Sequence, residues 1–212
     1  MQRTNWIFIT GALGLLLSCG KQGTPSYEIS SGRDAEKFVE AEKEKNTYEK
    51  KIKEVNFRLR YISHEQMALR DVEDLSKATQ ASFDSLVKGY EDFLFFNLEV
   101  EIDHFNEEMI HYMPDPNSMP GFEERTAYYS FGMQKDISMV LAEKDTIPCT
   151  VYHYERNYGV SPKNNFMLGF RSGAVKNAVL IYNNTCLTTG PVKFALNEQE
   201  LLNHPKIKIN PL

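Results

Sequence analysis

The chain has 212 residues, of which 25% are charged and 42% are hydrophobic, and its formal net charge at pH 7 is −5. This length suffices for one sizeable domain with its own hydrophobic core. The acidic balance and the lack of any Lys/Arg-rich block in the sequence argue against nucleic acid as a partner. The sequence also lacks the glycine-rich strand-to-helix motifs that cradle phosphates, which excludes the common nucleotide-binding classes and leaves no expected cofactor.

The N-terminus combines a basic start with a short apolar segment. Arg3 is followed by an apolar run from residue 7 to residue 17, and Cys19 comes directly after it. The run is much shorter than the roughly 20 residues that a membrane-spanning helix needs. A cleaved signal peptide is therefore a better interpretation than a retained transmembrane helix.

The order of basic start, apolar core and terminal Leu-Leu-Ser-Cys resembles the type II signal peptide of bacterial lipoproteins. The resemblance covers about the first twenty residues. It implies removal of residues 1–18 and acylation of Cys19 with palmitate-like chains, each of which contributes about 0.8 kcal/mol per buried methylene to membrane anchoring. The alternative is an ordinary cleaved signal peptide, or an N-terminal helix, that happens to contain a cysteine.

The residues that follow the cysteine bear on localisation. Gly20-Lys21-Gln22 lacks the acidic run typical of surface-exposed Bacteroidetes lipoproteins, and Gly20 is not the Asp that retains proteobacterial lipoproteins in the inner membrane. The resemblance therefore implies an anchor in the outer membrane, with the domain facing the periplasm. The lipid bilayer is then the first expected partner.

Two segments separate the anchor from the predicted domain. Residues 20–33 are rich in Gly, Pro and Ser, which predicts a flexible tether. Residues 34–50 are dominated by Glu and Lys and predict a helix that is solvated on most faces. We place the domain boundary near residue 47, so that residues 19–46 carry the lipid, the tether and the charged helix, and residues 47–212 form one globular domain.

The first half of this domain alternates between strand and helix patterns. Alternating apolar and charged residues predict a strand over residues 52–61. Ser63 and Gln66 form a capping box for a first helix, and a second helix is expected to end around Gly89. The alternating pattern returns in residues 93–102, which predict another strand.

From residue 125 onward the pattern is mainly β. Short aromatic or β-branched runs, separated by turn residues, predict strands at 127–133, 137–142, 146–154, 165–171, 178–182 and 192–196. Asn197 is expected to cap a last short helix. Short connections imply hairpins, so we expect an α+β fold: mainly an antiparallel β-sheet or sandwich, with two helices inserted after the first strand.

A metal site is the first chemical hypothesis. If residues 103–112 are helical, then His104, Glu108 and His111 share one face, and Glu108 with His111 forms the Glu-x-x-His pair found in helical carboxylate proteins. Such sites need further ligands from other helices, and the sequence has no second Glu-x-x-His. We therefore favour a solvated acidic helix with two incidental histidines over a metal site.

A contact surface is the second hypothesis, and it rests on residues 152–158. Tyr152, Tyr154 and Arg156 alternate along a predicted strand that leads to Tyr158 in a loop. Tyr and Arg are enriched at binding hot spots, because each buries much area and keeps a polar tip. Ordinary sheet packing is the alternative for any one of these side chains. The sequence contains no Gly-x-Ser-x-Gly elbow or other recognisable nucleophile triad.

Two covalent modifications are candidates. Cys149 and Cys186 remain once Cys19 is assigned to lipid, and they either form a disulfide in an oxidising periplasm or stay as two buried thiols. Asp145-Thr146-Ile147 and Asp84-Ser85-Leu86 look like the Bacteroidetes O-glycosylation sequon. Because Ser85 falls within a predicted helix, we retain Thr146 alone.

Three functional classes are compatible with these features. The leading hypothesis is a non-catalytic accessory lipoprotein that binds a partner protein in a cell-envelope assembly for secretion, motility or biogenesis. The second is a glycan-binding or small-molecule-binding lipoprotein that uses aromatic rings. The third, and least favoured, is a metal-dependent enzyme.

Overall fold

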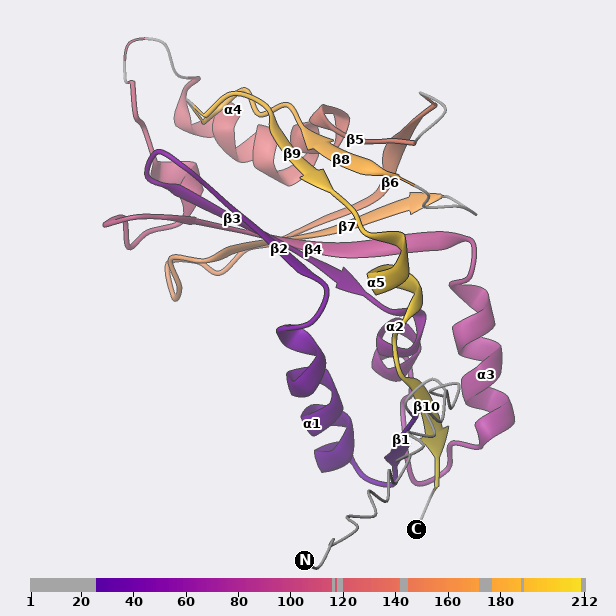
Figure 1. Ribbon diagram of the computed structural model, residues 1–212. Helices are drawn as coiled ribbons and strands as arrows, with labels where there is room; N and C mark the ends of the chain where they lie inside the picture. The colour runs from indigo at the N-terminus through magenta and orange to yellow at the C-terminus, as the bar shows by residue number, and fades with distance from the viewer. Residues whose placement is uncertain are drawn as a thin grey trace, which may run out of the picture.

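The computed structural model describes residues 26–115, 117, 120–141, 145–171, 177–187 and 189–210. The expected signal peptide, Cys19 and the first part of the expected tether lie outside these residues. A large antiparallel sheet lies beside a smaller lobe that contains three helices (Figure 1). Within the described part of the chain, no helix is long and apolar enough to cross a membrane.

Eight strands form the large sheet, and every neighbouring pair in it is antiparallel. Their order is β2-β3-β4-β7-β6-β5-β8-β9. The strands are β2 (Thr47–Ile52), β3 (Val55–Ile62), β4 (Phe93–Ile102), β5 (Ile137–Val140), β6 (Thr146–Glu155), β7 (Asn164–Arg171), β8 (Val179–Tyr182) and β9 (Val192–Ala195). The expected α+β fold with a mainly antiparallel sheet is confirmed.

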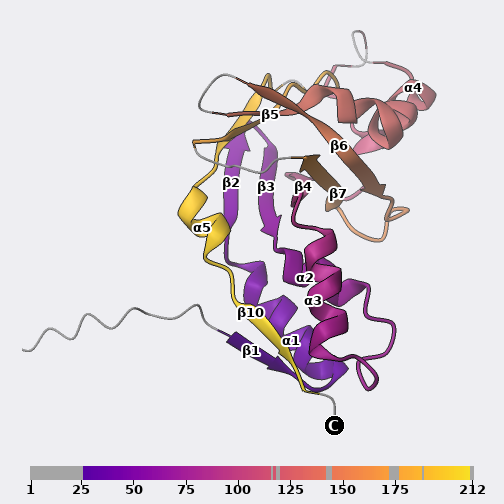
Figure 2. The same ribbon diagram turned by 90° about the vertical axis from the view of Figure 1, so that its right-hand side faces the viewer.

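The sheet curls so that its two halves enclose one core (Figure 2). Alternate residues of β3 and β4 are buried, as the pattern of apolar and polar residues predicts. Phe57 of β3 meets Tyr182 of β8 across this core, with their ring centroids 6.5 Å apart. At the edges, the backbone N–H of Asn197, just after β9, donates to the Tyr48 hydroxyl of β2 at 3.1 Å. Curling therefore brings the two edge strands toward each other.

The smaller lobe, which we call the helical lobe, has a separate core. It contains α1 (Gly32–Lys43), α2 (His64–Arg70) and α3 (Gln80–Gly89), together with the parallel pair β1 (Ser26–Ile29) and β10 (Lys206–Ile209). Buried apolar side chains from all five elements pack together in it. The first and last described strands thus lie side by side at the far end of this lobe (Figure 1).

Local capping explains where the two inserted helices begin. The predicted capping box of α2 is confirmed, since the Ser63 hydroxyl accepts from the Gln66 backbone N–H and the Gln66 side chain accepts from the Ser63 N–H. Thr79 and Ser82 form an equivalent box at the start of α3. The expected end of α3 at Gly89 is also confirmed.

The expectation of a tether is wrong for residues 26–33. Residues 26–29 form β1, whose backbone pairs with β10, and the Ser31 side chain caps α1 by accepting from the Asp34 N–H. The helix expected over 34–50 exists as α1 but ends at Lys43. Because β1 and α1 contribute to the core of the helical lobe, packing continues across the boundary that we expected near residue 47.

Two strand expectations require correction. The strand expected over 52–61 is two strands, since a turn with Lys53 at a φ of 54° separates β2 from β3. The segment 127–133 is not a strand. It continues helically from α4 (Phe122–Ala127) through a π-helical turn, η2 (Tyr128–Gly132), into a 3₁₀ turn, η3 (Met133–Asp136).

The buried positions explain this second error. Arg125, Tyr129 and Met133 are buried at intervals of four residues, the spacing of one helix face. The aromatic composition of the segment favoured a strand, but the spacing of its buried side chains is helical. The short helix capped by Asn197 is confirmed as α5 (Glu198–Leu202).

Candidate functional site

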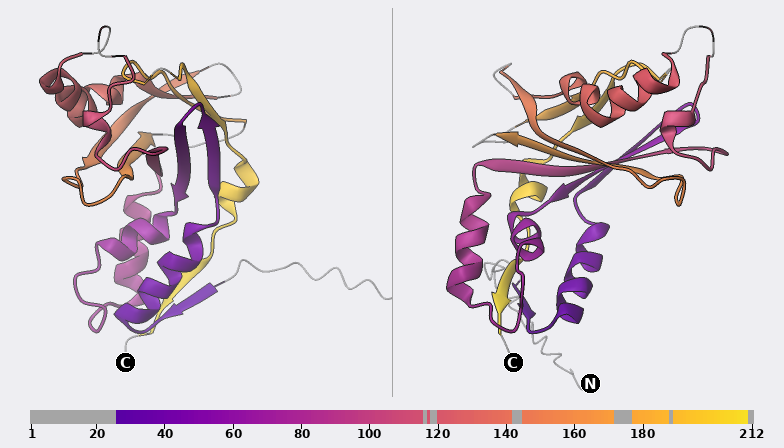
Figure 3. Two further views of the ribbon diagram at one scale, coloured as in Figure 1. Left: turned by 90° about the vertical axis from the view of Figure 1, so that its left-hand side faces the viewer. Right: turned by 180° about the vertical axis from the view of Figure 1, so that it is seen from behind.

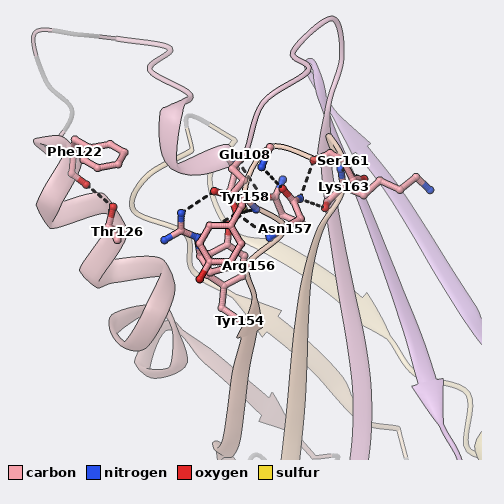
Figure 4. A network of polar contacts seen from close by, with 12 residues as sticks. Glu108, Phe122, Thr126, Tyr154, Arg156, Asn157, Tyr158, Ser161 and Lys163 are labelled. Carbon is pink, nitrogen blue, oxygen red and sulfur yellow. Dashed lines mark hydrogen bonds and ion pairs between the residues drawn. The ribbon is translucent and has the colours of Figure 1, made fainter.

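The buried carboxylate of Glu108 is the centre of the candidate site. Glu108 lies between β4 and α4, and its side chain is 2% exposed. Arg156 donates to it from Nε at 3.1 Å and from Nη2 at 2.8 Å. The backbone N–H groups of Asn157 and Tyr158 donate to the same carboxylate at 3.0 and 3.1 Å (Figure 4). Glu108, from the segment after β4, therefore fixes the start of the β6–β7 loop, residues 156–163.

The partners of Glu108 decide its charge. Burial alone would raise the pKa of Glu108, but the guanidinium of Arg156 and the two backbone N–H groups outweigh it and lower the pKa below its ordinary value. The same contact raises the pKa of Arg156. Glu108 accepts four hydrogen bonds from the loop, three of them at Oε1 and one at Oε2. The pair thus holds the start of the loop in one conformation.

Two asparagines continue this network. Asn157 donates from Nδ2 to the carbonyls of Ser161 and Lys163, each at 2.8 Å, so it closes the β6–β7 loop from within. The Asn164 side-chain oxygen accepts from the Tyr154 hydroxyl at 3.0 Å and from the Met109 N–H at 3.2 Å. Asn164 therefore joins the end of the loop to the segment that carries Glu108.

The tip of the loop presents its side chains to solvent. Tyr158 is 78% exposed and Val160 is 89% exposed. The φ of Tyr158 is 51°, which is unfavourable for an aromatic residue and persists only where the surroundings impose it. The Arg156 guanidinium lies 4.9 Å from the centre of the Tyr158 ring and supports that position. The loop thus holds an exposed aromatic ring in a defined place.

Further exposed aromatic side chains lie on α4 and η2. Phe122, at the start of α4, is 49% exposed and stacks on His111, while Phe131 of η2 is 77% exposed. Buried Arg125 attaches α4 to the Glu108 segment by donating to the Ile110 carbonyl at 2.8 Å. A cavity of about 300 Å³ lies between η2 and β6 and is lined by Ser130, Phe131, Gln134, Tyr152, His153 and Tyr154.

The four residues of the predicted contact surface have different environments. Tyr154 is 6% exposed and stacks on Phe166 at 4.7 Å, and the Tyr152 hydroxyl donates to the Tyr129 carbonyl within the protein. Both rings pack mainly into the core. Of the four, Tyr158 alone is largely exposed, and Arg156 acts behind it as the partner of Glu108.

The structure does not bring the three candidate metal ligands together. The expected helix over 103–112 is wrong, because His104 lies in a turn with a φ of 60° and the only helical part is a 3₁₀ turn, η1 (Met109–His111). His104 and His111 are exposed, whereas Glu108 is buried against Arg156. Among the described residues, no cluster of three or more His, Cys, Asp or Glu side chains could hold a metal ion.

The residues proposed for covalent modification lie in different environments. Cys149 and Cys186 are buried and unbonded, which matches the alternative of two thiols, and burial raises the pKa of Cys149 to about 11. Thr146 is exposed at the start of β6. Ser85 is exposed on α3. Cys19 lies outside the described residues.

Comparisons with known proteins add little. No family model and no curated protein matches the sequence. The solved structures that resemble this chain include a DUF4426 family protein from Pseudomonas aeruginosa, at 9% identity and a TM-score of 0.36, covering 72% of this chain and 92% of that one. Another is a protein of unknown function from Burkholderia pseudomallei, at 9% identity and a TM-score of 0.35, covering 80% of this chain and 86% of that one. At TM-scores below 0.5, these similarities carry no functional argument.

Proposed function

We propose that this protein is a non-catalytic lipoprotein of the bacterial envelope that binds a partner protein through the tip of its β6–β7 loop. The anchor in this proposal is a lipid on Cys19 in the outer membrane, with the domain in the periplasm. The partner belongs to a secretion, motility or biogenesis assembly. The observation that carries the binding role is the exposed Tyr158 ring held in place by the buried Glu108 and Arg156.

Pre-organisation is the physical reason for choosing this loop. Binding through a flexible loop costs conformational entropy, about 0.5–1.5 kcal/mol for each side chain that becomes immobilised. The bonds from Glu108 and Asn157 already restrict the β6–β7 loop in the unbound protein. Tyr158 and Val160 can therefore contribute buried area without that full cost, as expected of a hot spot.

Site-specific crosslinking in intact cells tests the binding role. A photoreactive phenylalanine at position 158 preserves an aromatic ring, and one at position 77 is a matched control, because Lys77 has an 84% exposed side chain in the helical lobe. We expect one defined adduct from position 158 and none from position 77. Mass spectrometry then identifies the partner. Equal labelling from both positions, or no adduct from position 158, would contradict the proposal.

Metabolic labelling tests the anchor separately. Radioactive palmitate should label the wild-type chain and should not label the Cys19→Ser variant. That variant should leave the membrane fraction while keeping the thermal unfolding of the wild type. Membrane association without palmitate incorporation would remove the lipoprotein assignment and leave the loop proposal intact.

The cavity between η2 and β6 supports a second candidate function. Phe131 and Tyr152 line it beside His153, and a volume of about 300 Å³ suits a small apolar ligand or a sugar ring. A glycan array would test this candidate, with Phe131→Ala as the variant expected to lose binding. A signal that Phe131→Ala leaves unchanged would exclude this cavity as the glycan site.

A further inference from the structure

The outer face of the sheet carries a concentration of polar side chains. Along β3, Asn56, Arg58 and Arg60 alternate with buried residues and therefore point away from the core. In the sheet register, Arg60 pairs with Asn97 of β4 and Arg58 pairs with Glu99. The C-terminal end of α1 lies next to this face (Figure 3).

A cavity of about 340 Å³ lies where the end of α1 meets this face. Four of its lining residues are cationic and two are asparagines: Lys43, Arg58, Arg60, Lys163, Asn97 and Asn165. The two acidic residues of its lining are Glu44 and Glu99. A second cavity, of about 430 Å³, adjoins it and shares the lining residues Arg58, Glu99 and Lys163. Together they form a groove with an excess of positive charge at the α1 end.

Most cations of this groove are neutralised by a neighbouring carboxylate. Arg58 pairs with Glu49 at 2.6 Å, and Lys163 pairs with Glu99 at 3.0 Å. Lys43 likewise pairs with Glu40 at 2.5 Å. These cations are therefore already satisfied in the unbound protein.

Arg60 differs from its neighbours. It is half-buried, and among the described residues no carboxylate lies within ion-pair distance of its guanidinium. Burial lowers the pKa of Arg60, and the like charge of Arg70 lowers it further, while Glu99 and Glu40 act only from a distance. An arginine in a protein does not lose its proton, so this charge is retained at an energetic cost.

Uncharged donors lie beside Arg60. Asn97 donates from Nδ2 to the Asn165 side-chain oxygen at 3.0 Å, which orients both amides across the floor of the groove. The Asn165 amino group has no acceptor among the described residues. A guanidinium and an amide N–H₂ that face one cavity match the acceptor oxygens of a phosphate or carboxylate group.

We propose that this groove is an oxyanion-binding site in which Arg60 is the principal contact and Asn165 the second donor. The ligand class is a phosphate monoester or a carboxylate, with the oxyanion at the α1 end and the rest of the molecule in the adjoining cavity. Lys163, the last residue of the β6–β7 loop, lines the groove, whereas Tyr158 and Val160 at the tip of the loop do not, so the site stands independently of the proposed partner binding.

Calorimetric titration of the full chain with inorganic phosphate, at constant ionic strength, tests the site. We expect saturable binding that weakens at least tenfold in Arg60→Gln and less in Arg60→Lys, because lysine keeps the charge but lacks the bidentate fork. Arg171→Gln is the matched control, since Arg171 is an exposed arginine of β7 outside the groove. Equal binding in wild type and Arg60→Gln, or no binding to wild type, would overturn the proposal.

Stability gives an independent measurement. If Arg60 is retained for a ligand, Arg60→Gln should unfold at the same or a higher temperature than wild type in phosphate-free buffer, and phosphate should stabilise the wild type alone. A purely structural Arg60 would instead make Arg60→Gln less stable in both buffers, which would contradict a ligand role.

Vesicle sedimentation distinguishes a lipid headgroup from a free anion. The wild type and Arg60→Gln are compared on phosphatidylcholine vesicles with and without phosphatidylglycerol. Arg60-dependent binding that requires phosphatidylglycerol identifies a headgroup ligand. Phosphate binding with no Arg60-dependent difference on vesicles identifies a free phosphate or carboxylate ligand. Both results support the site.

Discussion

Two buried glutamates, in different parts of the molecule, keep their negative charge through contacts with different partners. Glu108 at the end of the sheet binds Arg156 and two backbone N–H groups. Glu65 of α2, also 2% exposed, contacts His204 Nε2 at 2.8 Å and Lys206 Nζ at 2.7 Å. Burial would raise the pKa of each carboxyl, but the contacts outweigh burial, so both groups stay ionised. The pKa of Glu65 falls to about 2.

The difference lies in what each partner does when the carboxylate is removed or the pH changes. Arginine keeps its charge at any pH at which proteins fold, so Arg156 depends on Glu108 throughout. His204 can become neutral, and Lys206 has a 62% exposed side chain that water can solvate. Glu108 therefore holds the surface loop as long as its own carboxyl is ionised, whereas the contact between Glu65 and the C-terminal segment also depends on the charge of His204.

The largest expected effect is that of Glu108→Ala. It leaves a partly buried guanidinium and two loop N–H groups without their acceptor, and breaking such a pair costs about 3 kcal/mol of unfolding free energy when one partner retains access to water. Urea denaturation measures this. Double substitution with Arg156→Ala should recover part of the loss. Additive losses in the double variant would show that the two residues do not act as a pair.

Glu65→Ala should cost less, about 2 kcal/mol. Its partners can adapt, because His204 can lose its proton and Lys206 can turn to solvent. The same urea titration at pH 6 gives the comparison. A loss larger than that of Glu108→Ala would reverse the distinction drawn between the two glutamates.

The pH dependence of stability should separate the two sites further. Burial lowers the pKa of His204, but Glu65 outweighs it and raises that pKa above its ordinary value. The contribution of His204 to the free energy of unfolding is therefore full below about pH 6.5 and is lost as the pH rises through its raised pKa. The contribution of Glu65 is full above about pH 4.3 and is lost as the pH falls toward 2. The stability difference between wild type and His204→Gln should be largest between about pH 4.5 and 6.5. Thermal unfolding across pH 4–9 measures it, and a constant difference would contradict the ion pair.

The smallest effect is expected at the tip of the loop. Tyr158→Ala should change the unfolding free energy by less than about 0.5 kcal/mol, because the ring is mostly exposed and its support comes from groups behind it. Crosslinking or binding to the partner should nevertheless weaken. A large loss of stability would mean that Tyr158 holds the loop rather than being held by it.

Elements with local signals were predictable from the sequence. The alternation along β3 and β4 and the capping box of α2 each depend on residues within a few positions of one another. The pair β1 and β10 could not be found in this way. Each strand has four residues, they pair in parallel, and about 180 residues separate them, so the burial of both depends on helices that come between them in sequence.

The sequence predicts only part of the candidate site. The sequence indicates both Glu108 and Arg156 as candidates, but its local patterns connect Glu108 with a metal site and Arg156 with a contact surface. Their pairing spans 48 residues and depends on the turn at His104, where the backbone leaves the conformation that a helix requires. No periodicity carries that information. The special position of Arg60 is not visible in the sequence either. Whether a cation lacks an ion-pair partner depends on tertiary contacts, which no local sequence pattern shows.

The parallel pairing of β1 with β10 also has a mechanical consequence. If a pull on the chain ahead of Ser26 acts along the axis of β1, the hydrogen bonds to β10 lie across that direction. The bonds of the pair are then loaded together in shear instead of opening one at a time. A tension applied at the N-terminal side would thus be transmitted through the C-terminal strand into the helical lobe, and the first described strand would serve as a clamp rather than a fraying end.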